Sequence, residues 1–330
     1  MKKTVLKMLA LALAALMLIP AVVSCSKPDE ELEMKIYALN GTTALGMAQM
    51  ISTVEDGTAQ MNYDISLHTA ADAITGAITS GECAIAALPT NVAVRLFNKS
   101  EGKIQLLALN TLGVLYLLQN GEEITSLSDL KGKTVYVPGA GANPEYITAA
   151  LLEGAGLEVG KDVFVDGTTY NSPDAVQAAI TGNKISLAVL PEPKVTATVL
   201  SNENVKVALD LTDEWEKLNG ENTLVQGCLV VNTEFAAAHP NEVAKFLEDY
   251  KASVEFISEG SDDAINMIVE AGILPKAAMA KKALPNCNIC YIAGEEMKTV
   301  MNTFCEKIFD YDKASIGGAL PTDGFYYIAE

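Results

Sequence analysis

The sequence predicts an α/β protein folded into two lobes. Short apolar stretches rich in β-forming residues alternate with amphipathic helical stretches, and this alternation occurs in two successive series. Alternating strands and helices favour parallel sheets with helices on both faces. An apolar stretch at 226–232 follows the second series and is expected to return the chain to the first sheet. The chain of 330 residues is also longer than a single hydrophobic core usually serves, about 250–300 residues.

The first series consists of strands joined by helices whose ends carry capping residues. Gly41, Thr42 and Thr43 begin the helix after the first strand, where hydroxyl groups can cap free N–H groups. Gly81 is expected to close the next helix, because glycine readily adopts the left-handed conformation that ends helices. Thr90 is expected to be the N-cap of the third helix. The predicted strands are 34–40, 61–68, 83–89 and 103–110.

The second series begins after a segment at 111–120 that crosses between the lobes. Asn143 is expected to be an N-cap, with Pro144 at the first helical position. Another helix opens with Ser172 and Pro173. The predicted strands of this series are 133–139, 163–167, 186–191 and 205–210, and mostly helical stretches follow the return strand at 240–257, 261–272 and 294–309.

The first 24 residues have the pattern of a signal peptide. Three lysines precede an apolar run at 8–23, and small residues lead to Cys25. A transmembrane helix needs about 20 apolar residues and rarely has a proline near its end, so this run fits one poorly. Either the cysteine ends an ordinary signal by coincidence, or it resembles the lipid attachment point of a bacterial lipoprotein. Its position before a polar tether at 25–33 favours lipid attachment, with the mature chain outside the cytoplasm and anchored to the bacterial cell membrane.

The acidic balance of the chain argues against nucleic acid as a partner. The formal net charge is −19, with 23 basic residues and 42 acidic ones. Without the three lysines of the signal peptide, 23 − 3 = 20 basic residues face the same 42 acidic ones, and the charge becomes −22. Such a surface repels both phosphate backbones and anionic lipid.

Five cysteines follow Cys25, and an odd number cannot all pair. The C-x-x-C at Cys287 and Cys290 lacks the second ligand pair of a zinc site and the strand–helix context of a redox motif. Buried free thiols are therefore expected, although a disulfide between these two residues stays open. The five are Cys83, Cys228, Cys287, Cys290 and Cys305.

Catalytic motifs are missing from the sequence. His68 and His239 are the only histidines, and no nucleophile motif accompanies either one. The sequence contains no H-E-x-x-H, G-x-S-x-G or P-loop pattern. We therefore expect a protein that is not an enzyme and that uses no metal or cofactor.

Four stretches resemble the periplasmic-binding-protein superfamily: the signal end at Cys25, 126–147, 229–257 and 314–327. The chain is most similar to the branch that includes sulfonate-, nitrate- and thiamine-pyrimidine-binding proteins, and SLSDLKGKTVYVPGAGANPEYI at 126–147 is the most specific match. The resemblance implies a type 2 periplasmic-binding-protein fold with two crossovers. It places lobe 1 at 34–112 plus 228–330 and lobe 2 at 113–227.

The same resemblance implies a function. Proteins of this kind are solute-binding lipoproteins of ABC transporters, which close two lobes on a small molecule and deliver it to the permease and ATPase subunits. The resemblance implies a monomer with a sulfonate- or pyrimidine-like ligand. Two alternatives stay open: a tethered ligand sensor without transport, and an enzyme similar to the pyrimidine synthase of this branch.

Five loops are candidates for the ligand site, because ligands of open α/β sheets bind beyond the carboxyl ends of the strands. They offer hydroxyl groups, amides, free N–H groups or close backbone approach. Helix capping is the alternative role for several of them, and the crossover residues could instead serve as a hinge. Glu192 could bind a cationic group or complement its own helix. The candidates are Gly41, Thr42, Thr43, Pro89, Thr90, Asn91, Asn110, Thr111, Gly139, Ala140, Gly141, Ala142, Asn143, Glu192 and Gln226.

The single arginine, Arg95, bears on the ligand class. Amino-acid-binding relatives hold the α-carboxylate with an arginine fork. Because Arg95 lies about one turn into its predicted helix, it is expected to face solvent or a neighbouring acid. This disfavours an amino acid or dicarboxylate, and a neutral or weakly cationic heterocycle fits the acidic chain better. Trp215 is expected to be half-buried surface, and the tyrosines that could stack on a ring are Tyr37, Tyr116, Tyr146 and Tyr170.

Overall fold

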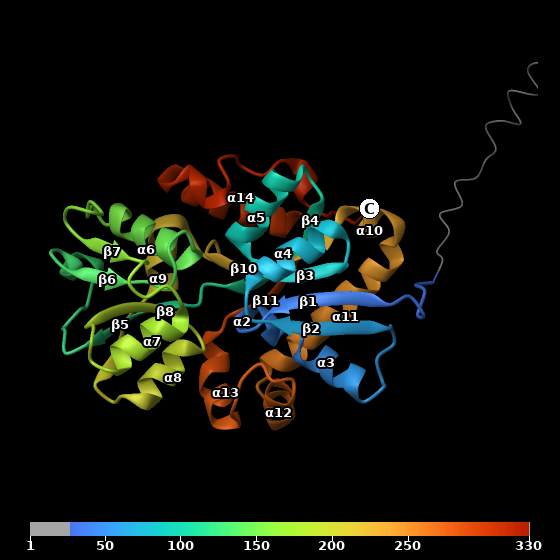
Figure 1. Cartoon of the computed structure of the whole chain (residues 1–330), viewed down its shortest axis with the longest axis horizontal. Helices are drawn as coiled ribbons and strands as arrows, with labels where there is room; N and C mark the ends of the chain where they lie inside the picture. Colours follow the sequence, from blue (N-terminus) through green and yellow to red (C-terminus); the bar gives the residue numbers. More distant parts are fainter. Residues whose placement is uncertain (1–26, 330) are drawn as a thin grey trace, which may run out of the picture.

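The computed structural model describes residues 27–329 and shows two lobes side by side (Figure 1). The predicted signal peptide at 1–24 and the predicted lipid attachment point Cys25 lie outside the described residues. Each lobe contains one β-sheet packed between helices. The predicted α/β fold is therefore confirmed. Across 27–329, no helix is long and apolar enough to cross a membrane.

The larger sheet has six strands in the order β11-β4-β10-β3-β1-β2. Strand β1 is parallel to β2 and β3, whereas β10 is antiparallel to both β3 and β4. All eight residues of β10 are buried, because this strand lies inside the sheet between two helical layers. It is the return strand predicted at 226–232. The bounds are β1 (Met34–Leu39), β2 (Tyr63–His68), β3 (Ile85–Pro89), β4 (Ile104–Leu112), β10 (Val225–Asn232) and β11 (Ile289–Ala293).

The smaller sheet has five strands in the order β7-β6-β8-β5-β9. Strand β6 is parallel to β7 and β8, and β5 is antiparallel to β8 and β9. The four strands predicted for the second series all occur in this sheet. The bounds are β5 (Leu115–Asn120), β6 (Thr134–Tyr136), β7 (Phe164–Asp166), β8 (Leu187–Pro191) and β9 (Val205–Asp210).

Two crossover segments connect the sheets, and a glycine in each permits close packing. Gly113 lies between β4 and β5, and a Cβ atom there would be 2.2 Å from Thr212 Oγ1. Gly227 lies near the start of β10, and a Cβ atom there would be 2.4 Å from Asn110 Oδ1. A side chain at either position would collide with its neighbours, so the chain passes between the lobes in tightly packed segments.

Most predicted helices are present, but two of the predicted N-caps are wrong. Gly81 ends α4 with φ +78°, and Ser172 Oγ accepts a hydrogen bond from the N–H of Ala175, as expected. Thr90 and Asn143 are instead the first residues inside α5 and α6, because the extended residue before each one is the cap. Their side chains bond to each other, Asn143 Nδ2 donating to Thr90 Oγ1 at 3.2 Å.

The helices include three short ones that were not predicted from the sequence, namely α9, α10 and α13. Around the larger sheet are α2 (Thr42–Leu45), α3 (Ala48–Glu55), α4 (Ala71–Ser80), α5 (Thr90–Ser100), α10 (Thr233–Ala238), α11 (Pro240–Ser258), α12 (Asp262–Glu270), α13 (Ala277–Ala283) and α14 (Gly294–Tyr311). Around the smaller sheet are α6 (Asn143–Gly154), α7 (Pro173–Thr181), α8 (Lys194–Ser201) and α9 (Leu211–Asn219).

Trp215 is buried, so its predicted position on a half-buried surface is wrong. Its side chain is 1 % exposed, and its Nε1 donates to Thr223 Oγ1 at 3.0 Å. Its ring centroid lies 5.9 Å from that of Phe304 in α14. Helix α14 also packs against α6, and so it joins the two lobes. The residues around Trp215 are polar because only one side of α9 meets this distant helix.

The five cysteines that follow Cys25 are all free in the structure. Burial raises the pKa of Cys83 and of Cys290 to about 12. The thiols are therefore protonated at neutral pH, as expected for cysteines that pack as small apolar residues.

Candidate ligand-binding cleft

A cavity of about 290 Å³ lies between the two lobes. Its wall combines loops that follow strands of the larger sheet, both crossovers, and the starts of helices beside the smaller sheet. This volume is close to the lower end for small-molecule pockets, about 300 Å³. The lining residues are Leu39, Asn40, Gly41, Thr42, Thr43, Pro89, Asn91, Val92, Arg95, Val114, Leu115, Ala142, Asn143, Pro144, Pro173, Pro191, Glu192, Pro193, Lys194 and Gln226.

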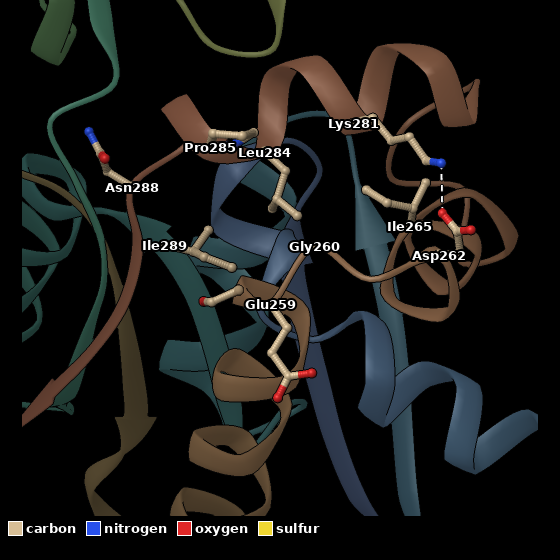
Figure 2. Close-up of a pocket in the computed structure, with 10 residues that line it drawn as sticks. Glu259, Gly260, Asp262, Ile265, Lys281, Leu284, Pro285, Asn288 and Ile289 are labelled. Carbon is tan, nitrogen blue, oxygen red and sulfur yellow. Dashed lines mark hydrogen bonds and ion pairs between the residues drawn. The ribbon is translucent and has the colours of Figure 1, made fainter.

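Another hollow, of about 550 Å³, lies on the lobe of the larger sheet (Figure 2). Lys281 and Asp262 pair there at 2.6 Å, and the Asp262 side chain is 83 % exposed. Among the described residues, none that lines this hollow has a buried polar atom without a partner. The cavity between the lobes differs in this respect, and it is the better candidate for a recognition site.

Two asparagines in the cleft wall have unpaired amide atoms. Asn91 in α5 is 1 % exposed, and neither its Oδ1 nor its Nδ2 has a hydrogen-bond partner. Asn143 in α6 is 4 % exposed; its Nδ2 is bonded to Thr90, but its Oδ1 is unpaired. Buried polar atoms are normally hydrogen-bonded. These atoms, one set from each lobe, therefore mark the part of the cleft wall where hydrogen-bond partners are missing.

Besides the four-residue helix α2, four helices have their N-terminal residues in the cleft wall: α5 from one lobe and α6, α7 and α8 from the other. A helix N-terminus carries a partial positive charge and favours an anion. Pro144 and Pro173 lie in the first turns of α6 and α7, and Pro193 is the N-cap of α8. Because proline fixes φ, this part of the wall is stiff as well as electropositive.

Arg95 lines the cleft, so the expectation that it faces solvent or an acid is wrong. Its Nη1 donates to the carbonyl oxygen of Gly141 at 3.3 Å, which links α5 to a loop of the opposite lobe. No carboxylate in residues 27–329 forms an ion pair with it. Arg95 follows Asn91 by four residues, and residues with this spacing lie on one face of a helix. Both side chains therefore lie on the face of α5 that meets the cleft.

Glu192 lines the cleft and is 2 % exposed. Its two carboxylate oxygens accept hydrogen bonds from Thr196, at 3.1 Å from the backbone nitrogen and 2.8 Å from Oγ1. Burial raises the pKa of Glu192, and the bonds from Thr196 oppose this shift. Of the two roles predicted for Glu192, the geometry favours the complement to its own helix, because both oxygens already bond to the first turn of α8.

The structure brings together part of every predicted loop. The candidates in the cleft wall are Gly41, Thr42, Thr43, Pro89, Asn91, Ala142, Asn143, Glu192 and Gln226. The candidates outside the lining are Thr90, Asn110, Thr111, Gly139, Ala140 and Gly141. The four tyrosines considered for stacking also lie outside it. Whether any of these residues touches a ligand stays a prediction.

The candidates outside the lining support the wall from behind. Asn110 Nδ2 donates to the carbonyl oxygen of Thr43 at 3.0 Å, and Thr111 Oγ1 donates to Asn110 Oδ1 at 3.0 Å. Thr90 Oγ1 donates to the carbonyl oxygen of Val225 at 2.9 Å. The N–H of Gly141 donates to Glu145 Oε2 at 2.6 Å. These bonds fix the loops that carry the lining residues.

The sequence analysis missed Arg95 and most of the apolar wall. The four-residue spacing between Asn91 and Arg95 was a signal that could have revealed the arginine. Pro144 and Pro173 gave no such signal, because only the packing of α6, α7 and α8 beside the smaller sheet brings them to the same wall as Pro191 and Pro193.

Residues 102–264 match a family model described as NMT1/THI5 like. No curated protein matches the chain at a significant level. An ABC transporter structure from Parabacteroides distasonis is 23 % identical, with a TM-score of 0.74, over 92 % of this chain and 100 % of that one. The periplasmic aliphatic sulphonate-binding protein SsuA of Escherichia coli is 14 % identical, with a TM-score of 0.70, over 88 % and 96 %. The periplasmic nitrate-binding protein NrtA of Synechocystis is 13 % identical, with a TM-score of 0.58, over 80 % and 70 %.

These similarities confirm the resemblance found in the sequence. Both SsuA and NrtA are described as periplasmic binding proteins. The chain therefore has the type 2 periplasmic-binding-protein fold, and it is similar to sulfonate- and nitrate-binding proteins that have this fold.

Proposed function

We propose that this protein captures a small organic anion between its lobes and delivers it to an ABC importer. The observation that carries the proposal is the combination of Arg95 with the N-termini of α5, α6 and α7 in the wall of the cleft. The N-terminus of α8 is already complemented by the Glu192 carboxylate. Helix N-termini and guanidinium groups both favour anions. A sulfonate-like ligand therefore fits this wall better than the neutral or weakly cationic pyrimidine-like ring expected from the net charge.

We also propose that the lobes, at 34–112 plus 228–330 and at 113–227, close on the ligand by bending at the crossovers. Two hydrogen bonds between the lobes support this idea: Arg95 to Gly141 and Asn143 to Thr90. Both bonds lie beside the cavity. A ligand that contacts both lobes would stabilise the same closed arrangement.

The proposed cellular setting is extracytoplasmic, with a monomer attached to the membrane by lipid on Cys25. The partners would be the permease and ATPase subunits of the importer, in keeping with the similarity to ABC transporter proteins. A tether raises the local concentration of a binding protein beside its permease. Replacing Cys25 with serine should move the protein from the membrane fraction to the soluble fraction.

The alternative functions have less support. A pyrimidine-synthase-like enzyme would need a reactive side chain at the site, and within residues 27–329 neither histidine lines the cleft. A tethered sensor would use the same cleft as a transport protein. Permease and ATPase genes beside this one would favour transport, and their absence would favour a sensor.

Thermal unfolding of the 26–330 fragment with candidate ligands tests the binding role. Benzenesulfonate, nitrate, pyrimidines and glutamate form the panel. A ligand at 100 times its dissociation constant should add about 2.7 kcal/mol to the stability of the folded state. We expect stabilisation by organic anions. If only uncharged or cationic compounds stabilise the fragment, the proposed anion site is wrong. Glutamate is included because the position of Arg95 removes the reason for excluding it.

A further inference from the structure

The unpaired amide atoms in the cleft wall define what a ligand has to offer. Asn91 presents one free donor, Nδ2, and one free acceptor, Oδ1. Asn143 presents only a free acceptor, Oδ1, because its Nδ2 is bonded to Thr90. A buried donor or acceptor without a partner lowers stability. A ligand that satisfies all three atoms therefore carries two hydrogen-bond donors and one acceptor.

A donor beside an acceptor is the pattern of an amide edge, N–H next to C=O. Such an edge pairs with a side-chain amide through two hydrogen bonds, and a second N–H could reach the oxygen of Asn143. Sulfonate and nitrate groups carry acceptors only, so they leave the oxygens of both asparagines unpaired. An anionic head alone does not match this part of the wall.

The rest of the wall favours negative charge and a compact ring. Arg95 has no acidic partner among the described residues, and the helix N-termini add positive potential. Proline rings from both lobes line the cleft and leave flat apolar surface. The volume of about 290 Å³ corresponds to about ten water molecules. A single five- or six-membered ring with one short acidic arm fits this space.

We infer that the ligand is a cyclic amide, imide or ureide that also bears a carboxylate or sulfonate group. This inference rests on the proposed function, and it assigns Asn91 and Asn143 as the residues that distinguish such a ligand from a simple organic anion. Asn91 would pair with the N–H–C=O edge of the ring. Arg95 would bind the acidic group.

Isothermal titration calorimetry of the purified protein with four probes tests the inference. Hydantoin-5-acetate carries both groups, and orotate carries them on a six-membered ring. Hydantoin carries only the amide edge, and cyclohexanecarboxylate carries only the charge. We expect hydantoin-5-acetate or orotate to bind about 100-fold more tightly than either single-group probe, because a site built for hydrogen bonds rejects compounds that lack them.

The variant N91L separates recognition from structural support. Because Asn91 makes no hydrogen bond in the protein, the variant should unfold at the same or a higher temperature than the parent. Its affinity for the better two-group probe should fall about 30-fold or more, while cyclohexanecarboxylate binding should not change. The matched control is N266L, on the exposed face of α12 and away from the cleft, which should leave all affinities unchanged.

The outcomes distinguish the inference from the proposed function. If cyclohexanecarboxylate or benzenesulfonate binds as tightly as the two-group probes, the inference is wrong and the anion site stands. If no anion in either panel binds, both are wrong. A lower unfolding temperature for N91L, with unchanged affinities, would assign Asn91 a structural role. Should N91L fail to fold, the comparison of the four probes on the unaltered protein still tests whether the ligand needs both the amide edge and the acidic group.

Discussion

The side-chain oxygen of Gln226 accepts a hydrogen bond from the backbone N–H of Val114, with an N···O distance of 2.6 Å. Gln226 belongs to one crossover and Val114 to the other, and both residues line the cleft. The carbonyl oxygen of Val114 in turn accepts a hydrogen bond from the N–H of Glu192 at 2.9 Å. The crossover peptide is therefore held between two residues that line the cleft. If Gln226 contacts the proposed ligand, binding should alter the bend between the lobes.

Replacing Gln226 with alanine should weaken both the hinge and the site. The change leaves the buried N–H of Val114 unpaired, which should lower the free energy of unfolding by about 1–3 kcal/mol in urea titrations. Affinity for the ligand should fall as well. Q119A is the matched control, because Gln119 Oε1 accepts a similar bond from Ile124 N at 2.7 Å and Gln119 does not line the cleft. Equal losses of affinity in the two variants would contradict a special role for Gln226.

Gly227→Ala should destabilise the crossover by overpacking. The added Cβ would lie 2.4 Å from Asn110 Oδ1 and 2.8 Å from Thr43 Cγ2, so the strand has to shift. We expect a loss of about 1–3 kcal/mol in chemical denaturation. By contrast, Gly76→Ala in α4 meets no atom within 4 Å and should add about 0.5–1 kcal/mol. A neutral effect of G227A would show that the crossover packs more loosely than described.

R95Q should reduce anion binding about tenfold or more. The change removes the positive charge from the cleft and the hydrogen bond to Gly141, and hydrogen bonds to charged groups contribute about 1.5–3 kcal/mol. K99Q removes the same charge from an exposed position on the same helix and should change the dissociation constant less than twofold. Calorimetry at two salt concentrations provides the measurement. If R95Q and K99Q lose the same affinity, anion binding depends only on the net charge of the protein, and Arg95 makes no direct contact with the anion.

E192Q should be more stable than the parent protein, and the difference between the two should grow as the pH rises. Burial raises the pKa of Glu192, so the folded state holds this proton at pH values where the unfolded chain has released it. Stability from this group is therefore full below the ordinary pKa of glutamate, about 4.3, and is lost as the pH rises through the folded-state pKa. Glutamine cannot lose a proton and should remove this part of the pH dependence.

The measurement for E192Q is urea unfolding of both proteins between pH 4 and pH 7.5. The difference in unfolding free energy, variant minus parent, should grow with pH. A difference that stays constant across this range would mean that Glu192 has the same pKa in the folded and unfolded states.

Local signals in the sequence determined most of the fold. The apolar stretches gave all the strands of both sheets except β5 and β11. Gly81 and Ser172 marked helix ends because glycine and serine act on their own turn of backbone. The rule that ligands bind beyond the carboxyl ends of parallel strands then located the cleft. All of these features depend on residues close together in the chain, and so a pattern in the sequence suffices to predict them.

Tertiary structure alone decided which side chains line the cleft. Arg95 faces Gly141 and Asn143 bonds to Thr90 because the two lobes meet beside the crossovers. Prolines far apart in the chain form one wall because α6, α7 and α8 pack beside the same sheet. Trp215 is buried for the same reason, since α14 reaches it from the end of the chain. These contacts depend on how the lobes lie against each other, and no short segment of sequence encodes that arrangement.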